Sequence, residues 1–416
     1  MKKSLIVKMF LVFLLLLAGC GIEPDNNYRR DRSLPITVEK TSLNLMFYYE
    51  GQDRFAFINK LCNGFNKAQE EIEVVPVFIP FKDFKKAILT GIEEENNPDI
   101  IIIDNPDNVY FANIGILADI TDNIADWPDK DQYFENSLLT CTYKGRIYGM
   151  PLGNNCLALF YNKKLFEIEG VKPPKTWDEL RSVAKKMTKG DVKGIAIAAQ
   201  NSEEGTYQFL PWLFSAGGSI EKLDSTEAVK AFSFLADLIK DGSMSREVIN
   251  RTQHDVMKEF VAGKTAMMIN GSWQIPQINS LMPDIEYGVV KIPKDKKFSS
   301  VLGGENIAII NSENKEKAIK FMFYVCKPEN LKLYSSTLGY FPPRKDVALD
   351  PSIAQDFAIK VFENEMQYAS LRGPNPKWPE ISSVISGALQ EVLTGTKEPE
   401  SVVKDAQNKI NLILEQ

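Results

Sequence analysis

The hydrophobic pattern after residue 40 switches several times between the period of a strand and the period of a helix. Residues 42–48 alternate apolar and polar side chains, as a strand with one buried face does. Residues 98–104 contain an unbroken apolar run bounded by turn-forming residues, which is typical of a parallel strand buried on both faces. Between these two segments the pattern predicts a helix around Phe57, Leu61 and Phe65, a strand at 72–78 and a helix at 81–92.

The alternation of strands and helices continues through the rest of the chain. Thr176 and Glu179 have the spacing of a capping box at the start of a helix. Further on, the pattern predicts strands at 195–199 and 265–270 and helices at 226–239 and 256–263. This order favours βαβ units in open α/β sheets, and the length of 416 residues predicts at least two domains.

The first twenty residues have the pattern of an export signal. Two lysines precede an apolar run that ends in Leu-Ala-Gly-Cys at residues 17–20, which resembles a bacterial lipobox. The resemblance implies a signal peptide at 1–19 and an acylated Cys20 that anchors the protein on the outer face of the cell membrane. Residues 20–42 are then a polar, flexible tether. An uncleaved anchor helix is the alternative, but Lys8 interrupts it.

Composition and charge exclude several classes of partner. The 49 basic and 55 acidic side chains give the whole chain a net charge of −6, and loss of Lys2, Lys3 and Lys8 with the signal makes it −9. No dense basic run compensates, so the sequence argues against binding of nucleic acid or of anionic lipid. Beyond the signal, no apolar run has the length needed to cross a membrane.

The cysteines and the single histidine do not form a metal-binding pattern. Cys62, Cys141, Cys156 and Cys326 are far apart in the sequence, so either two disulfides or buried free thiols are possible, and we favour free thiols. His254 lies in a charged segment and is predicted on a solvated helix face. We therefore predict neither a metal site nor a cofactor.

Several separated segments of the chain carry one common pattern, and the longest is the run YKGRIYGMP at 143–151 with the segments that follow it. The segments are 98–121, 143–151, 160–163, 173–180, 260–273, 302–306 and 339–344. Together they resemble one protein family, the extracellular solute-binding proteins of carbohydrate ABC importers (the maltose-binding-like group, family 1).

The resemblance implies an α/β fold of the two-lobed periplasmic-binding-protein type (type II), with discontinuous lobes and a ligand in the cleft between them. Lobe one is then predicted at 43–150 and 268–309, and lobe two at 151–267 and 310–416. The three hinge crossings are expected near 149–151, 267–270 and 309–311. Several short connections of this kind act as a hinge, and ligand contacts with both lobes favour the closed state.

Candidate ligand residues are polar and aromatic side chains at the strand ends and in the segments that resemble the family. Sugars need amides, carboxylates or arginine for their hydroxyls and aromatic rings for their C–H faces. The predicted ligand-binding residues are Tyr48, Tyr49, Asp104, Asn105, Asn155, Trp212, Gly218, Asn270, Trp273, Gly304, Glu305, Tyr340 and Arg344. Glu50, Asn154, Gly303, Arg372 and Trp378 are weaker candidates.

Some of these candidates have an equally ordinary structural interpretation. Asp104 or Asn105 could cap a helix, Trp212 has the helical spacing of a core residue, and either tyrosine after the first strand could be buried in the core. Arg372 fits a lid or a surface loop equally well. Trp273 is the best single candidate.

The function predicted from the resemblance is non-catalytic. The protein is expected to bind a sugar or an oligosaccharide as a lipid-anchored monomer and to deliver it to the permease subunits of an ABC transporter. A binding protein for a sensor kinase is one alternative. An exported carbohydrate-active enzyme is another, with Glu305 and Asp104 as its two carboxylates.

Overall fold

The computed structural model describes residues 40–94, 97–354 and 357–415. The predicted signal peptide, the predicted anchor Cys20 and all but the last three residues of the predicted tether lie outside this part of the chain.

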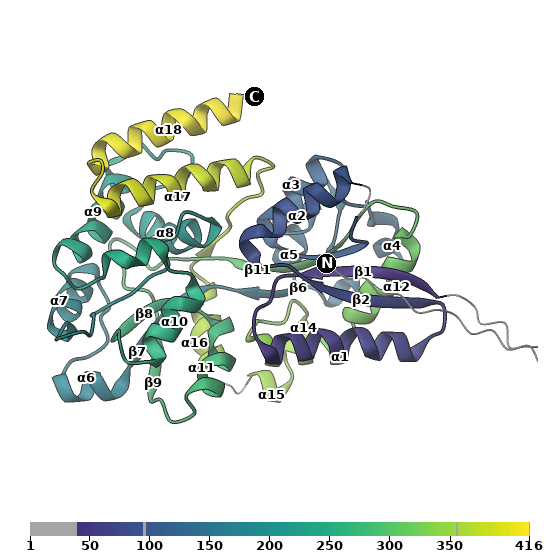
Figure 1. Cartoon of the computed structure of the whole chain (residues 1–416), viewed down its shortest axis with the longest axis horizontal. Helices are drawn as coiled ribbons and strands as arrows, with labels where there is room; N and C mark the ends of the chain where they lie inside the picture. Colours follow the sequence, from purple (N-terminus) through teal and green to yellow (C-terminus); the bar gives the residue numbers. More distant parts are fainter. Residues whose placement is uncertain (1–39, 95–96, 355–356, 416) are drawn as a thin grey trace, which may run out of the picture. The chain divides into compact units, whose positions relative to one another are not determined.

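A five-stranded sheet organises the first set of elements (Figure 1). Its strand order is β2-β1-β3-β11-β6; β1 is parallel to β2 and β3, while β11 is antiparallel to β3 and β6. The three strands predicted at 42–48, 72–78 and 98–104 are confirmed as β1, β2 and β3. The strands of this sheet are β1 Thr41–Phe47, β2 Ile72–Phe78, β3 Ile100–Asp104, β6 Met150–Asn155 and β11 Gly303–Ile309.

Helices cover both faces of this sheet, which explains the unbroken apolar run of β3. Ile100 and Ile102 point into the core shared with α1, whereas Ile101 and Ile103 point into the core shared with α2 and α3. The predicted helical stripe of α1 is buried, and the helix ends where the Gln69 side chain accepts a hydrogen bond from the N–H of Ile72 (2.7 Å). The helices on this sheet are α1 Gln52–Ala68, α2 Phe81–Glu93, α3 Asn105–Asn113, α12 Lys315–Val325 and α13 Pro328–Leu338.

A second sheet of three strands organises the other set of elements. Its order is β8-β7-β9, and both neighbours are antiparallel to β7. The strands are β7 Leu157–Asn162, β8 Met267–Gly271 and β9 Tyr287–Val290, so the strand predicted at 265–270 is confirmed. Residues 195–199 differ from the prediction: Ala196 bridges to β8, but the N–H of Ile195 bonds to the carbonyl of Ser243, so no continuous ladder forms.

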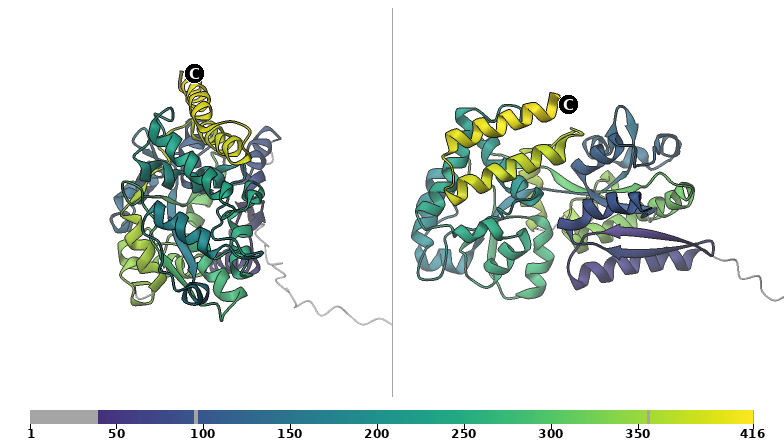
Figure 2. Two further views of the ribbon diagram at one scale, coloured as in Figure 1. Left: turned by 90° about the vertical axis from the view of Figure 1, so that its left-hand side faces the viewer. Right: turned by 45° about the horizontal axis from the view of Figure 1, so that its top comes forward.

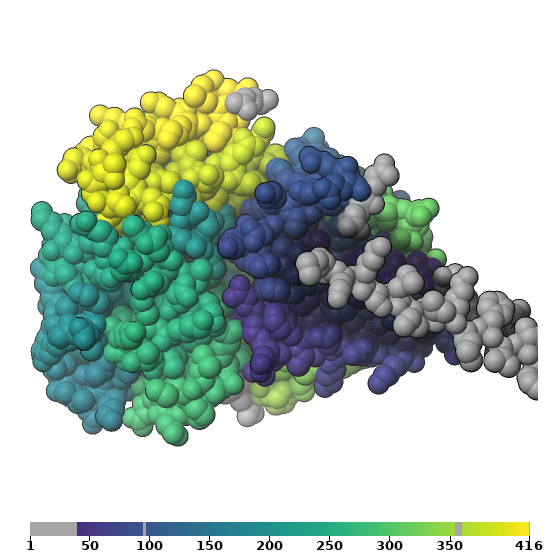
Figure 3. Space-filling model, in the orientation of Figure 1, coloured from purple at the N-terminus to yellow at the C-terminus, as the bar shows by residue number. Residues whose placement is uncertain are grey.

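Helices from distant parts of the sequence pack together around the second sheet. The helices predicted at 226–239 and 256–263 are confirmed as α9 and α10. Figures 2 and 3 show the C-terminal α17 and α18 lying together above the half that contains α8 and α9. These helices are α6 Lys163–Glu169, α7 Trp177–Met187, α8 Glu203–Ala216, α9 Thr226–Lys240, α10 Gln253–Val261, α11 Ile275–Leu281, α16 Phe357–Met366, α17 Trp378–Thr394 and α18 Pro399–Glu415.

The predicted capping box at α7 forms only in part. The Thr176 hydroxyl accepts a hydrogen bond from the N–H of Glu179 (3.3 Å), as expected for an N-cap. The Glu179 carboxylate accepts from the N–H of Lys175 (2.6 Å) instead of from Thr176. Short elements complete the fold: α4 Thr121–Ala125, η1 Lys130–Gln132, α5 Glu135–Leu139, β4 Thr142–Tyr143, β5 Arg146–Ile147, η2 Arg246–Asn250, η3 Ser272–Gln274, β10 Ser300–Val301, α14 Lys345–Ala348, α15 Pro351–Ala354 and β12 Ala369–Ser370.

We name the two groups of elements by their sheets. The five-strand lobe is the five-stranded sheet with α1, α2, α3, α12 and α13; the three-strand lobe is the three-stranded sheet with α6–α11 and α16–α18. The short helices α14 and α15 pack on α13 and belong to the five-strand lobe as well. The chain passes from β6 to β7 at Cys156, returns between β9 and β11, and leaves the five-strand lobe for the last time after α15.

This strand pairing differs from the predicted division at 150, 268 and 310. The prediction placed 268–309 in lobe one, but β7 pairs with β8 along 157–161 and with β9 along 159–162, so both strands belong to the sheet of β7. It also placed 310–416 in lobe two, whereas α12 and α13 pack on α1 and the five-stranded sheet. Whether these lobes move as rigid bodies stays a prediction.

Two further findings concern the membrane and the cysteines. Among the residues that the structure describes, no helix combines the length and the apolar character needed to span a membrane. Cys62, Cys141, Cys156 and Cys326 are buried free thiols, the alternative that the sequence favoured.

Candidate functional site

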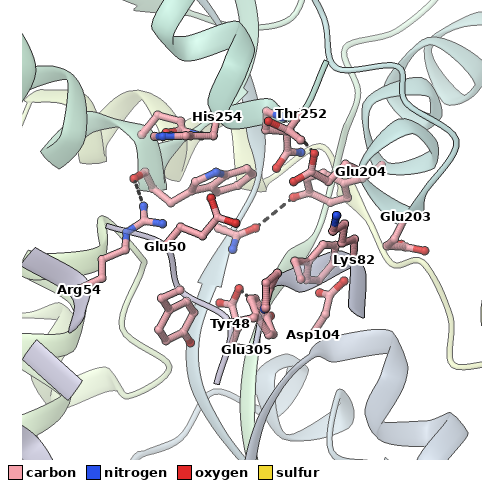
Figure 4. A pocket seen from close by; sticks show the side chains of 18 of the residues that line it. Tyr48, Glu50, Arg54, Lys82, Asp104, Glu203, Glu204, Thr252, His254 and Glu305 are labelled. Carbon is pink, nitrogen blue, oxygen red and sulfur yellow. Dashed lines mark hydrogen bonds between the residues drawn. The ribbon is translucent and has the colours of Figure 1, made fainter. Parts of the chain in front are cut away.

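A cavity of about 370 Å³ lies between the two lobes. Strands β1 and β3 end and strand β11 begins on one side of it, and α8, α10 and η3 face them from the other side. Figure 4 shows Tyr48, Asp104 and Glu305 opposite Glu204, Thr252 and His254. The cavity is lined by Tyr48, Tyr49, Glu50, Arg54, Pro80, Phe81, Lys82, Asp104, Asn155, Gln200, Glu203, Glu204, Tyr207, Thr252, Gln253, His254, Trp273, Gln274, Gln277, Gly304, Glu305, Tyr340 and Arg372.

Sheet topology brings the first wall of the cavity together. Because β1 and β3 are parallel, their carboxyl ends meet at one edge of the sheet. Strand β11 begins at the same edge in the opposite direction, and its Glu305 lies directly across from Asp104. Its neighbour Gly304 has φ +139° and passes so close to the backbone of Gly153 that a side chain there would overlap it.

Glu305 is a buried carboxyl group whose two oxygens differ in their hydrogen bonds. Its Oε1 accepts hydrogen bonds from the hydroxyls of Tyr340 (3.0 Å) and Tyr48 (3.2 Å). Its Oε2 is buried and has no hydrogen-bond partner among the described residues. Burial, and next the negative charge of Asp104, raise the pKa of Glu305 to about 8. Oε2 is therefore the oxygen left to carry the proton.

Asp104 forms a buried ion pair with Arg372. The Arg372 guanidinium donates to both oxygens of Asp104 at 2.6 Å and to Oε1 of Glu203 at 2.7 Å. Both Asp104 and Arg372 are less than one-tenth exposed. Desolvation disfavours the charged guanidinium, but the two carboxylates outweigh it and hold the pKa of Arg372 well above its usual value. Arg372 is thus part of the cavity wall and not a surface loop.

The second wall is built around the start of α10. Glu204 of α8 accepts hydrogen bonds from the N–H of Gln253 (3.0 Å) and from the amide of Gln200 (3.1 Å). Thr252 and Asp255 form a capping box that fixes the same helix start. Burial raises the pKa of Glu204 to about 7, even though the Gln253 N–H favours its charged form.

His254 extends this wall, in contrast to the predicted solvated helix face. The side chain is partly buried and lines the cavity. Burial lowers its pKa below the usual value, and the positive charge of Lys258 acts in the same direction. His254 is therefore neutral at pH 7 and can both donate and accept one hydrogen bond.

Trp273 presents an aromatic surface to the cavity and is held from two sides. The indole packs on Gly271, where a Cβ atom would overlap the ring, so a larger residue at 271 would displace it. The backbone carbonyl of Trp273 accepts a hydrogen bond from the Arg54 side chain (2.6 Å). The centres of the Trp273 and Tyr207 rings lie 6.1 Å apart. Tyr207 in turn donates to Oδ1 of Asn155 at 3.0 Å.

The structure brings together eight of the thirteen predicted ligand residues. The predicted residues that line the cavity are Tyr48, Tyr49, Asp104, Asn155, Trp273, Gly304, Glu305 and Tyr340. The weaker candidates Glu50 and Arg372 also line it. Contact of any of these residues with a ligand stays a prediction.

The other five predicted residues lie outside the cavity lining. Trp212 is fully buried among Trp177 and Phe234, because α8 turns its apolar face to the core. Gly218 follows α8 and packs against Leu213. These two positions are structural, as the helical spacing of Trp212 already allowed.

Asn105, Asn270 and Arg344 are buried outside the lining of the cavity, and the last two support other elements. Asn105 begins α3 and makes no cap hydrogen bond. Asn270 donates to the carbonyl of Gln253 (2.9 Å) and so supports the α10 wall from behind. Arg344 binds Asp129 and Asp346 within the five-strand lobe.

Three weaker candidates also lie behind the surface of the cavity. Asn154 donates to the hydroxyl of Ser137 (2.8 Å), and Trp378 donates to the carboxylate of Glu203 (3.1 Å). Gly303 pairs with Asn155 in the sheet and is not among the lining residues.

Sequence reasoning missed several polar residues of the site. They are Arg54, Lys82, Gln200, Glu203, Glu204, Gln253, Gln274 and Gln277. Most of them stand in the first turn of a helix, where polar residues are common for reasons of capping alone. The one available sequence signal for this wall of the site was the pair Glu203 and Glu204 at the start of α8, because most of the rest of that helix is apolar.

The chemistry of the cavity suits a polar ligand with apolar faces. The lining combines rings from both lobes with amide and carboxyl groups, which can contact both the apolar faces and the hydroxyls of such a ligand. Among the described residues, no group of three or more histidine, cysteine or acidic side chains is placed to hold a metal ion.

Comparison with known proteins gives a consistent result. A family model described as bacterial extracellular solute-binding protein matches residues 60–361. A putative binding protein of Brucella abortus is 28% identical over 348 residues, which cover 81% of this chain and 84% of the relative. The maltotriose-binding protein of Pyrococcus abyssi is 29% identical over 367 residues, which cover 82% of this chain and 77% of the relative.

The fold comparison agrees with the sequence comparison. A crystal structure of an ABC transporter solute-binding protein from Thermotoga lettingae, bound with α-D-tagatose, has a TM-score of 0.85 and 30% identity. The match covers 90% of this chain and 100% of that chain. The two-lobed α/β fold of periplasmic sugar-binding proteins, predicted from the sequence, is thereby confirmed.

The buried carboxyl of Glu305 makes a prediction about pH. The unfolded chain releases this proton near the ordinary pKa of 4.5, whereas the folded protein keeps it to about 8. The unfolded state thus binds fewer protons between these values, so stability falls as pH rises from about 5 to 8. Glu305→Gln should reduce this fall by on the order of 1.4 kcal/mol per unit of pKa difference.

Urea unfolding at several pH values measures the effect. Glu365→Gln is a matched control, because Glu365 is also buried, has its pKa raised by burial to about 8, and is not among the residues that line the cavity. Both variants should flatten the pH dependence of the free energy of unfolding. An unchanged slope in Glu305→Gln would show that Glu305 is ionised in the folded protein at pH 7.

Proposed function

Because the chain belongs to the bacterial extracellular solute-binding protein family, we propose that it captures a sugar or an oligosaccharide between its two lobes and passes it to the permease of an ABC importer. The ligand is released unchanged. Binding energy in such a protein shifts an equilibrium between open and closed lobes, by as much as the ligand prefers the closed form.

The observation that carries this proposal is the cavity between the lobes, with the carboxyl group of Glu305 on one wall and the indole ring of Trp273 on the other. Oε2 of Glu305 suits a sugar hydroxyl, and Trp273 suits the C–H face of a sugar ring. The tagatose bound to the Thermotoga relative and the maltotriose of the Pyrococcus relative's name support a sugar as the ligand class.

The proposal also includes attachment of the protein to the membrane by a lipid anchor. Acylation of Cys20 would hold the protein outside the cell, where a ligand is captured, and the tether would let a monomer reach its permease. The support for this step is the Leu-Ala-Gly-Cys sequence at residues 17–20.

The enzyme alternative is disfavoured by the positions of its two carboxylates. Glu305 and Asp104 face each other across one strand pair, so they stand on the same wall and do not flank a ligand. Asp104 is also held by Arg372 through both of its oxygens. A sensor kinase as the partner would use the same closed form.

A panel of sugars tests the ligand class. Thermal unfolding with mono- and oligosaccharides should identify a ligand that adds about 2.7 kcal/mol of stability at 100 times its Kd. Trp273→Leu should remove most of this stabilisation and leave the unliganded protein folded. Trp212→Leu is the matched control: it should lower the stability of the unliganded protein by about 2–4 kcal/mol and keep the ligand effect, because Trp212 is core.

Two outcomes of this panel would contradict the proposal. One is that no sugar stabilises the protein while a phosphorylated polyol such as glycerol 3-phosphate does. The other is that a sugar is recovered chemically altered after incubation with the protein.

Membrane fractionation tests the anchor. Cys20→Ala should prevent lipid attachment and abolish incorporation of labelled fatty acid. Cys62→Ala is the control, since Cys62 is a buried thiol inside the five-strand lobe and should leave labelling unchanged. Labelled protein in the Cys20→Ala membrane fraction would refute the anchor.

A further inference from the structure

Arg372 stands where the two lobes meet at the edge of the cavity. It lies on the segment between β12 and α17, and its side chain is 4% exposed. Both neighbouring elements belong with the three-strand lobe: β12 pairs with β10, which contacts β7, and α17 packs on α8, α9 and α18. The side chain therefore reaches the five-strand lobe from the other lobe.

The contacts of Arg372 divide between the two lobes. Toward its own lobe, it donates to Glu203 at 2.7 Å, and its guanidinium carbon lies 4.5 Å from the centre of the Tyr207 ring. Toward the five-strand lobe, two parallel hydrogen bonds of 2.6 Å reach Asp104 at the end of β3. The first set fixes the guanidinium plane, and the second set crosses between the lobes.

Glu203 is itself fixed, so the arginine cannot follow Asp104 if the lobes separate. The indole N–H of Trp378 donates to both Glu203 oxygens at 3.1 Å, and the hydroxyl of Ser382 donates to Oε2. Both donors belong to α17. Opening of the lobes would thus break the bidentate pair with Asp104 and leave that carboxylate without its guanidinium.

We propose that Arg372 is a positioning residue that holds the two walls of the cavity at the spacing of the closed, ligand-binding form. The inference rests on the proposed function, because it assigns a role in closure to a residue of that site. The ion pair between Arg372 and Asp104 stabilises the closed arrangement of the lobes in the protein without ligand. Less of the ligand's binding energy is then spent on closing the lobes, so the apparent affinity is higher.

Arg344 offers an internal comparison. It too is buried and binds two carboxylates, Asp129 at 2.9 Å and Asp346 at 2.7 Å. Its other partner is the carbonyl of Cys326, at the end of α12. Every one of these contacts lies on the side of the five-strand lobe, so Arg344 stabilises that lobe without linking it to the other.

Matched lysine variants separate the two roles. Lysine keeps the positive charge, but its single ammonium group cannot make the paired hydrogen bonds to Asp104 and the hydrogen bond to Glu203 at the same time. Spin labels on cysteines introduced at the exposed Lys60 of α1 and Lys164 of α6 report the distance between the lobes. In the protein without ligand, Arg372→Lys should lower the population at the short distance, and Arg344→Lys should leave the distance distribution unchanged.

Ligand affinity gives a second readout. If the closed population falls to about a tenth, the apparent Kd of the sugar weakens about tenfold. Arg344→Lys should lower Tm and keep Kd within about twofold. If Arg372→Lys does not fold, Asp104→Asn removes the pair from the other side, and the same shift in distance is expected.

The outcomes are distinguishable. An unchanged distance distribution in Arg372→Lys or Asp104→Asn, or an equal shift in Arg344→Lys, would overturn the role of Arg372. Failure of the wild-type protein to bind any sugar contradicts the proposed function instead, and the distance measurement, which uses no ligand, still decides the role of Arg372.

Discussion

Acidic side chains buried between the two lobes are the constraint on which the rest of the site depends. Glu305, Asp104 and Glu203 each place a carboxyl group where little water can reach it, and an ionised carboxylate left unpaired there is strongly destabilising. Two tyrosine hydroxyls donate to the first, and the guanidinium of Arg372 holds the other two. What remains is one buried oxygen of Glu305 that has no hydrogen-bond partner among the described residues, in a side chain that lines the cavity.

The strands of the five-stranded sheet bring several of these groups to one edge, and the first three of these strands could be predicted from local sequence patterns. The unbroken apolar run of β3 indicated a strand covered on both faces, and α2 and α3 on one side with α1 on the other explain it. Sheet membership could not be predicted in the same way. Strand β8 looks like any short apolar strand, and only its pairing with β7, more than one hundred residues earlier in the chain, places it in the three-strand lobe.

Site residues that directly follow a strand could be predicted from the sequence. Site residues in the first turn of a helix could not. Tyr48 was predicted because it follows a strand, and the ends of parallel strands share one edge of a sheet. Glu305 was predicted because its segment resembles the family. Trp212 lies in the core and outside the lining of the cavity, because a tryptophan within an apolar helix can pack into the core as well as contact a ligand. Glu203 and Glu204 were missed because acidic residues in a first helical turn are explained by the helix dipole alone. Their partners come from α17 and α10, which no local pattern connects to α8.

A crystal structure of the protein with a bound sugar tests the central claim most directly. The account predicts a sugar in the cavity between β11 and α10, with a hydroxyl within hydrogen-bonding distance of Oε2 of Glu305 and a ring face against Trp273. A sugar bound elsewhere, or one in the cavity that leaves Oε2 of Glu305 without a partner, would contradict it.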